Sequence, residues 1–446
     1  MYLLTEAAPL LRDRRLSSDE LTQDCLANIA RLNPVLNAFI TVTDELALRQ
    51  AKQADAEIAA GKYRGPLHGI PIALKDLIDV EGVPTTAASR QFTQRIPQHD
   101  AAIVARLRHA GAVMVGKTNL HEFAFGGSGV VSAFGPARNP WDTSRITGGS
   151  SSGSAAAVAA GMCIAAIGTD TAGSVRIPAA LCGILGHRPS TGVWSSEGII
   201  PLRKSFDTPG PMTRTVEDAS LLMRSIGERP APVSVEINRL RLGVAREGFY
   251  EGLDAEVATS LQHAEDVLRA LVGSMRDVTV KVDARWSSFD GEILDYHQPM
   301  LEATPELYQS GTLARLRTCS VETPEQYRAV KSAVQEERLA AEKVFDDVDV
   351  VVTPTCVVPA PRIGDLQAMS AAELRAYEVE YLLRNTAPFS LLYWPTVSVP
   401  CGFTNSGLPI GMQISARPGA DEVALQVAAA YEQATAWHKR LPPIVA

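Results

Sequence analysis

Paired cysteines are missing from this chain of 446 residues. Its six cysteines are scattered, and none forms a C-x-x-C pair; they stand at positions 25, 163, 182, 319, 356 and 401. A disulfide framework or a zinc site needs clustered thiols at short spacings. Several of these cysteines lie in apolar stretches such as 161–167 instead. We therefore expect buried thiols in a reducing compartment, and we predict no bound metal.

Long apolar runs are missing as well. The first 21 residues reach Glu6 and then the charged stretch 12–15 without an apolar core, which is not the pattern of a secretory signal peptide. The longest run of small apolar residues, 155–168, is shorter than the ~20 residues that span a bilayer. We expect a soluble cytoplasmic protein that does not bind a membrane.

The chain has no excess of positive charge. It carries 42 Lys and Arg against 50 Asp and Glu, a formal net charge of −8, and such a surface repels the phosphate backbone of nucleic acids. Its composition, 46% hydrophobic and 21% charged, is typical of a folded globular protein. We therefore expect a sizeable core and no nucleic-acid partner.

The sequence does contain a repeated alternation of helix-like and strand-like segments. We predict helices over 17–32 (with a capping box of Ser17 or Ser18 and Glu20), 43–60, 100–110, 155–161 and 423–437, with a further helical start in 118–125. We predict strands over 71–79, 111–116, 163–167 and 349–353, and a hairpin of 396–399 with 409–414. This alternation predicts an α/β layered fold.

Residues 111–118 (GAVMVGKT) match the phosphate-loop string G-x-x-x-x-G-K-S/T. That loop requires a strand before its first glycine and a helix that begins at its lysine, so that free backbone N–H groups surround the phosphates. Here the residues before Gly111 are helical in pattern, and the four spacer residues are themselves strand-like. We therefore reject a nucleotide-binding role for this string.

A lysine stands inside an apolar strand, at Lys75 in the segment 71–79 (PIALKDLID). Lysines are rarely fully buried, because the ammonium group loses its hydration there. Two interpretations are open. Either the amine extends from the strand end to water, or burial lowers its pKa and provides a neutral amine that acts as a base.

A first stretch of glycine and serine, 148–154 (GGSSSGS), leads directly into an alanine-rich helix. Taken alone, such a string is typical of a linker, but core-like sequence on both sides opposes that interpretation. A helix N-terminus of this kind offers free amides and the positive end of the helix dipole. The residues alone do not choose among Ser150, Ser151 and Ser152.

A second stretch, 168–176 (GTDTAGSVR), directly follows an apolar strand. A loop of small residues before a serine lets successive N–H groups point into one cavity, which is the geometry of an oxyanion hole. This context makes Ser174 a candidate nucleophile. We expect Asp170 and Arg176 to pair and hold the loop rigid, in a structural role.

With these strings the chain resembles the amidase signature family. The resemblance runs densely from 65–71 (GPLHGIP) to about Arg214 and reappears at 353–355 and 408–411. Its hallmarks are 116–123 (GKTNLHEF), 134–142 (FGPARNPWD), 148–154 and 168–190 (GTDTAGSVRIPAALCGILGHRPS). We expect one large α/β/α layered domain over 1–446, in which helices cover a mixed, mostly parallel central sheet. The helical, charged segment from about 230 to 345 is expected to be cap-like.

The resemblance implies a Lys–cis-Ser–Ser triad of Lys75, Ser150 and Ser174, with a cis peptide bond between Gly149 and Ser150. Neutral Lys75 would accept a proton from Ser150 as Ser150 takes one from Ser174, whose alkoxide attacks a carbonyl carbon. No histidine, cofactor or metal is needed, and His187 is interpreted as structural.

The same resemblance assigns an oxyanion hole to four backbone N–H groups, those of Thr171, Ala172, Gly173 and Ser174. Ala172 and Ser152 stand where the family usually or often carries glycine. Both replacements are small, and the Cβ of Ala172 requires a negative φ unless strain is accepted. We expect activity to survive both.

Two further features bear on the substrate. The stretch 126–131 (GGSGVV) is less polar than its counterpart in the A subunits of glutamyl-tRNA amidotransferases, which favours an apolar or bulky acyl group over glutamine. Arg203 and Lys204 stand near the family's site entrance. We interpret them as solvated surface charge, with contact to the substrate as the alternative.

We therefore predict a serine amidohydrolase that cleaves C–N bonds of small-molecule amides, with carbamates (urethanes) or aryl amides as extensions, through an acyl-enzyme on Ser174. The alternative is the glutamine-hydrolysing A subunit of a multi-chain amidotransferase, which would bind partner proteins. A non-catalytic relative that serves as a binding module is a third interpretation, and the intact triad argues against it. The oligomeric state stays open, with a homodimer among the alternatives.

Overall fold

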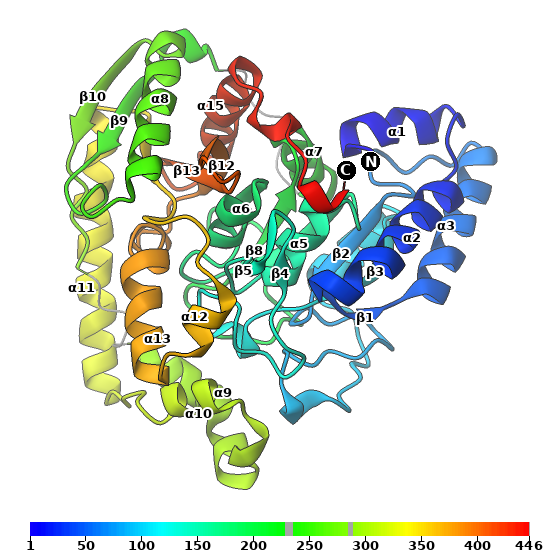
Figure 1. Ribbon diagram of the computed structural model, residues 1–446, viewed down its shortest axis with the longest axis horizontal. Helices are drawn as coiled ribbons and strands as arrows, with labels where there is room; N and C mark the ends of the chain where they lie inside the picture. The colour runs from blue at the N-terminus through cyan, green and yellow to red at the C-terminus, as the bar shows by residue number, and fades with distance from the viewer. Residues whose placement is uncertain (228–234, 284–288, 446) are drawn as a thin grey trace.

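A mixed sheet of eleven strands runs through the protein in the computed structural model, which describes residues 1–227, 235–283 and 289–445 (Figure 1). The strand order across the described part of the sheet is β1 (Phe39–Val42), β3 (Val113–Thr118), β2 (Pro71–Lys75), β6 (Ala165–Asp170), β8 (Thr208–Thr213), β7 (Leu185–Arg188), β12 (Thr396–Phe403), β13 (Pro409–Ala416), β11 (Val350–Pro354), β9 (Arg241–Ala245) and β10 (Ser274–Val278). The predicted α/β class and the mixed sheet are confirmed.

The prediction that this sheet is mostly parallel is wrong. Parallel pairing is confined to the two ends, where β3, β2 and β6 run side by side, as do β11, β9 and β10. In the strand order, all neighbouring strands from β6 through β8, β7, β12 and β13 to β11 pair antiparallel. The strand β1 also pairs antiparallel with β3. The predicted hairpin is one cause, because β12 and β13 are joined by a loop too short for the crossover that parallel strands require.

Helices cover both faces of the sheet (Figure 1). In chain order they are α1 (Leu4–Arg12), α2 (Ser18–Leu36), α3 (Asp44–Ala59), α4 (Ala102–His109), α5 (Ser152–Ala159), α6 (Arg176–Cys182), α7 (Val216–Ile226), α8 (Ala255–Leu271), α9 (Asp290–Ala303), α10 (Ser310–Leu316), α11 (Pro324–Glu342), α12 (Ile363–Gln367), α13 (Ala371–Tyr377), α14 (Ala387–Leu391) and α15 (Asp421–Ala434). A π-helical segment, Glu378–Leu383, joins α13 to the residues before α14.

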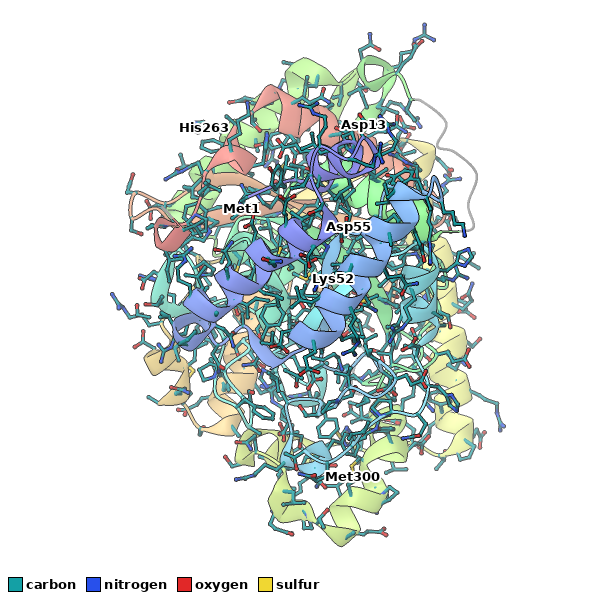
Figure 2. All side chains as sticks on the ribbon, turned by 90° about the vertical axis from the view of Figure 1, so that its right-hand side faces the viewer. Met1, Asp13, Lys52, Asp55, His263 and Met300 are labelled. Carbon is teal, nitrogen blue, oxygen red and sulfur yellow. The ribbon has the colours of Figure 1, made fainter. Side chains whose placement is uncertain are left out.

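The predicted capping box at the start of α2 is confirmed. The Ser17 side chain accepts a hydrogen bond from the Glu20 N–H, and the Glu20 carboxylate accepts one from the Ser17 N–H at 2.9 Å. The helix then runs past the predicted end to Leu36. Asp55 of α3 accepts hydrogen bonds from the first two N–H groups of α2, so the two helices lie side by side on the face turned to the viewer in Figure 2.

The strand β2 presents its side chains to two cores. Ile72 and Leu74 pack into a cluster with α4 and α7, whereas Ala73 packs on the opposite face with α2, α3 and α5. Because successive side chains of a strand point to opposite faces, Lys75 lies on the face of Ala73. That face is the one covered by α5, which begins at Ser152 within the serine-rich stretch 148–154.

The segment 230–345 differs from the expectation of a helical cap. Its strands β9 and β10 extend the central sheet by parallel pairing, and α8 packs into the core formed with β12 and β13. Charged residues on β10 and α8 obscured this in the sequence. The helices α9 and α10 lie at one end of the molecule, and α11 runs along its edge (Figure 1).

Two short elements precede α5. Residues 134–154 contain a two-stranded sheet of β4 (Arg138–Asn139) and β5 (Asp142–Ile146). In 118–125 the helix is a single 3₁₀ turn, Glu122–Ala124, in which Phe123 has a φ of +51°. The left-handed backbone at Phe123 prevents a longer helix there.

Five of the six cysteines are buried, and Cys319 is half-buried. All six are free thiols, as predicted from their scattered positions. In the part of the chain that the structure describes, no helix combines the length and apolar character needed to cross a membrane.

Candidate active site

Lys75 ends β2 with its side chain fully buried. Its Nζ lies 2.7 Å from Ser150 Oγ and 2.7 Å from Thr169 Oγ1, and the Thr169 carbonyl oxygen is 3.3 Å away. Burial lowers the pKa of Lys75 from 10.5 to about 7, and the negative charges of Asp170 and Asp207 oppose this change. The interpretation in which the amine reaches water is therefore excluded, and a large fraction of Lys75 is neutral near pH 7.

The serine-rich stretch offers Lys75 one hydroxyl. The Ser151 hydroxyl bonds to the backbone of Thr169 at 3.3 Å, and the Ser152 hydroxyl donates to the Asn119 carbonyl at 3.3 Å. Ser150 is the member whose hydroxyl contacts the amine, and the peptide bond between Gly149 and Ser150 is cis. The geometry thus makes the choice that the residues alone left open.

A buried carboxylate holds the loop between β6 and α6. Asp170 accepts hydrogen bonds from Arg176 Nε at 3.0 Å and Nη2 at 3.1 Å, so the predicted pair is confirmed. Arg188 adds a second ion pair to Asp170 at 3.6 Å. Burial alone would raise the pKa of Asp170, but the two arginines outweigh it and hold that pKa well below its usual range. The carboxylate also accepts the N–H groups of Gly173 at 2.8 Å and Val175 at 3.2 Å. These contacts fix the loop from inside.

The oxyanion-hole expectation fits this loop in part. Because the Gly173 N–H donates to Asp170, it is not available to an incoming oxygen, and in this respect the structure differs from the expectation. Thr171, Ala172 and Ser174 line the cavity described below. Ala172 is absent from the residues with positive φ, so its Cβ causes no backbone strain.

Gly173 is required by its surroundings. Its φ is +134°, and a Cβ at this position would lie 2.1 Å from Thr386 Oγ1. The same Thr386 hydroxyl donates to the Ala172 carbonyl at 2.6 Å, which ties the loop to the start of α14. Only glycine allows this close approach.

The Ser174 hydroxyl faces the cavity with no hydrogen-bond partner among the residues that the structure describes. The nearest link to the serine-rich stretch is through the backbone, where the Ser151 N–H donates to the Ser174 carbonyl at 3.1 Å. Catalytic hydrogen bonds often form fully only with the substrate in place. A proton relay from Ser174 to Ser150 would require the hydroxyl to turn toward Ser150.

The phosphate-loop string is confirmed as a strand, β3, and its lysine has another role. Lys117 Nζ pairs with Asp76 Oδ1 at 2.9 Å and donates to Thr85 Oγ1 at 2.7 Å, with both ion-pair partners buried. In the register of β2 and β3, Lys117 lies opposite Leu74. A lysine held in this ladder has no free loop around it to bind phosphate.

A cavity of about 390 Å³ opens next to Ser174. One wall comes from residues 124–126, 171, 172, 174, 202 and 203, and the other comes from α10, α13, the π-helical segment and α14. The main contributors to that second wall are Arg315, Arg375, Glu378, Val379, Glu380, Leu383, Arg384, Ala387 and Pro388. Gly129 and its two valine neighbours are not part of the lining, and Val130 packs into an apolar cluster instead. Of the stretch 126–131, Gly126 does line the cavity, but the two valines do not and so give no support to an apolar acyl group.

Arg203 is not the solvated charge that we expected. Its side chain is buried, it lines the cavity, and its guanidinium pairs with Asp290 of α9 at 2.6 Å. Lys204, the next residue, is exposed. The sequence did not show this because Asp290 stands 87 positions away.

Two buried groups were missed in the sequence, His121 and Glu378. His121 lies within the motif 116–123, its Nδ1 is 3.8 Å from Glu378, and burial lowers its pKa to about 4. Glu378 accepts hydrogen bonds from the Ser128 N–H and hydroxyl and pairs with Arg315. His187, by contrast, lies on β7 beside Asp421 at 3.4 Å and outside the cavity lining, as a structural residue does.

Among residues 1–227, 235–283 and 289–445, no cluster of His, Cys, Asp or Glu side chains has the arrangement of a metal site. The cavity is instead lined by Ser174 and by other residues of the loop that Asp170 holds, and the buried Lys75 amine contacts Ser150 outside that lining. A family model described as Amidase matches residues 20–290 and 298–425.

The chain belongs to the amidase family. This confirms the resemblance to the amidase signature family, and the matched residues include all three members of the expected triad.

Known proteins similar to this amidase-family chain differ in what they are named for. The glutamyl-tRNA(Gln) amidotransferase A subunit of Nostoc punctiforme is 35% identical over 494 residues, with 100% of both chains covered. A solved structure described as an amidase is 32% identical, with a TM-score of 0.88 over 97% of this chain and 99% of that one. A 6-aminohexanoate cyclic dimer hydrolase, solved with its substrate, is 29% identical, with a TM-score of 0.88 over 100% and 99%.

Proposed function

We propose that this protein hydrolyses the C–N bond of small-molecule amides through an acyl-enzyme on Ser174. The observation that carries the proposal is the 2.7 Å contact between Lys75 Nζ and Ser150 Oγ, made by a buried amine with a pKa of about 7. An amine of that pKa is neutral often enough at neutral pH to act as a general base. The Ser174 hydroxyl, which lines the adjoining cavity, is then the nucleophile.

The reaction proceeds in two steps. Ser174 Oγ bonds to the carbonyl carbon while its proton passes to Ser150 and the Ser150 proton passes to Lys75. The C–N bond then breaks, and the proton held by Lys75 returns through Ser150 to the leaving nitrogen. Water attacks the resulting ester by the same route, which releases the carboxylic acid and restores the Ser174 hydroxyl.

The negative charge on the attacked oxygen needs donors that do not move. The backbone N–H groups of Thr171, Ala172 and Ser174 are the candidates, since that of Gly173 is held by Asp170. Asp207 supports this assignment, because it accepts the Thr171 hydroxyl at 2.6 Å and so fixes the start of the loop. A fixed donor in such a site contributes about 100-fold or more to the rate.

The test is to compare Ser174→Ala with the unchanged protein in two assays, amine release from anilide, amide and carbamate substrates, and covalent labelling by a serine-reactive phosphonate. Both activities should disappear in Ser174→Ala. Ser320→Ala, which removes an exposed hydroxyl, should retain both. Labelling that persists in Ser174→Ala would place the nucleophile elsewhere.

A second candidate is favoured by the Nostoc punctiforme relative, which is named as part of an amidotransferase. In that function the same site would hydrolyse glutamine within a multi-chain assembly. Ammonia release from glutamine should then appear only when the partner proteins are added, and anilides should not be hydrolysed by the chain alone. Hydrolysis of simple amides by the isolated chain, with no glutamine hydrolysis after the partner proteins are added, would reject this candidate.

A further inference from the structure

The cavity beside Ser174 is lined by four arginines and two glutamates. The arginines are Arg203, Arg315, Arg375 and Arg384, and the glutamates are Glu378 and Glu380. These groups come from the second wall and from the segment after β7, not from the triad. They are therefore placed to contact the part of a substrate that extends away from the scissile bond.

Three of the four arginines have a carboxylate partner. Arg203 pairs with Asp290 at 2.6 Å, Arg315 pairs with Glu378, and Arg384 pairs with Glu380 at 2.8 Å. Arg384 also donates to the Glu251 carbonyl, and Arg315 donates to the Phe125 carbonyl at 2.5 Å.

Arg375 differs from the other three. In the described part of the chain, its guanidinium makes no hydrogen bond and has no carboxylate within 4.0 Å. The side chain is half-buried in the cavity wall. Burial and the nearby charges of Arg315 and Arg203 lower its pKa, while Asp290, which is already paired with Arg203, opposes this change.

The cavity offers no comparable unmatched carboxylate among its described lining residues. Glu378 is saturated, since its oxygens receive the Ser128 N–H at 3.0 Å, the Ser128 hydroxyl at 2.5 Å and the Arg315 guanidinium. Glu380 is paired with Arg384. Among the described lining residues, both glutamates thus have an arginine partner, and the lining has one positive charge in excess.

We propose that the acyl part of the substrate carries a carboxylate and no ammonium group, and that Arg375 binds this carboxylate. The substrate class is then the monoamide of a dicarboxylic acid. A guanidinium matches a carboxylate with two parallel hydrogen bonds, and a partly desolvated cation gains most from an anionic partner. This inference rests on the proposed amide hydrolysis and names the substrate of the same site.

The first measurement compares matched substrates of the unchanged protein. Succinamate, glutaramate and adipamate are each compared with the neutral amide of equal length, butanamide, pentanamide or hexanamide. We expect at least one carboxylate substrate to exceed its neutral counterpart in kcat/KM by roughly 10- to 100-fold, the effect of one hydrogen-bonded ion pair. Glutamine, which is glutaramate with an added ammonium group, should be a poorer substrate than glutaramate.

The second measurement identifies the residue. Arg375→Gln should remove the preference for the carboxylate substrate over the neutral amide, mostly through a higher KM for the carboxylate substrate. Arg375→Lys should restore part of the preference. Arg317→Gln is the matched control, because it removes an exposed arginine that does not line the cavity.

Binding is measured separately from turnover. Calorimetry on the Ser174→Ala protein gives Kd values for glutaramate and pentanamide without hydrolysis, so a failure of the proposed chemistry does not hide the result. Tighter binding of glutaramate that is lost in Ser174→Ala/Arg375→Gln supports the proposal. Equal binding of the two compounds, a preference that survives Arg375→Gln, or tighter binding of glutamine than of glutaramate would each overturn it.

Discussion

Replacing Lys75 with methionine should change how the stability of the folded protein depends on pH. The side chain is fully buried, and methionine fills a similar volume without an ionisable group. In the unchanged protein, burial lowers the pKa of this amine from 10.5 to about 7. The free energy of unfolding must reflect that difference, because the unfolded chain returns the amine to water.

The direction in which the unfolding free energy changes with pH follows from proton binding. Between about pH 7 and pH 10 the unfolded chain holds a proton on this lysine and the folded protein does not, so stability rises with pH by up to about 1.4 kcal/mol per pH unit. The unfavourable contribution of Lys75 is therefore roughly 4 kcal/mol near neutral pH and about 2 kcal/mol near pH 9. Below about pH 7 both states are protonated, and the full contribution persists.

The assay is urea unfolding of the unchanged protein and of Lys75→Met across this pH range. The difference in unfolding free energy between them should shrink by about 2 kcal/mol from about pH 7 to about pH 9. Hydrogen bonds lost with the amine shift this difference by a constant and do not alter its slope. Lys52→Met, which removes an exposed lysine of α3 (Figure 2), should show no such slope. A constant difference for Lys75→Met would refute a neutral buried amine.

Three other outcomes follow from the site. The value of kcat/KM should rise about tenfold per pH unit up to about pH 7 and stay level above it, because the neutral form of Lys75 is the base in the proposed mechanism. A profile that is flat from acid to alkaline pH would contradict that role. Gly173→Ala should lower kcat by about 100-fold or more, since the new Cβ meets Thr386, whereas Gly364→Ala, in open space, should keep normal turnover. Arg176→Met should lower the urea unfolding free energy by about 3 kcal/mol, and an unchanged midpoint would show that Arg188 alone neutralises the carboxylate beneath the loop.

The sequence was most informative where function depends on local strings. Lys75 was visible as a charge in an apolar strand, and Ser174 as a serine at the end of a loop of small residues. The choice of Ser150 over its neighbours needed the position of the Lys75 amine, which comes from another strand. No pattern within 148–154 carries that information.

Contacts between segments that are distant along the chain could not be predicted from the sequence. Arg203 appeared to be surface charge because Asp290 is remote along the chain, and the role of Glu378 depends on Ser128 and Arg315. The prediction of mostly parallel strand pairing was wrong for a similar reason. A strand pattern reports which faces are buried, but the neighbours of β6, β7 and β8 are set by the path of the whole chain.

The two walls of the cavity have separate origins in the chain. The proposed reacting groups stand on β2, in the serine-rich stretch and in the loop before α6, whereas the opposite wall is formed largely by residues 375–388. An exchange of residues 375–384 with those of a relative would therefore replace the surface that we propose to contact the acyl group and leave Lys75, Ser150 and Ser174 in place. For protein engineering, residues 375–384 are therefore the part of this wall to vary, whereas Thr386 is kept, because its hydroxyl and its carbonyl oxygen contact Ala172 and Arg176, on either side of Ser174.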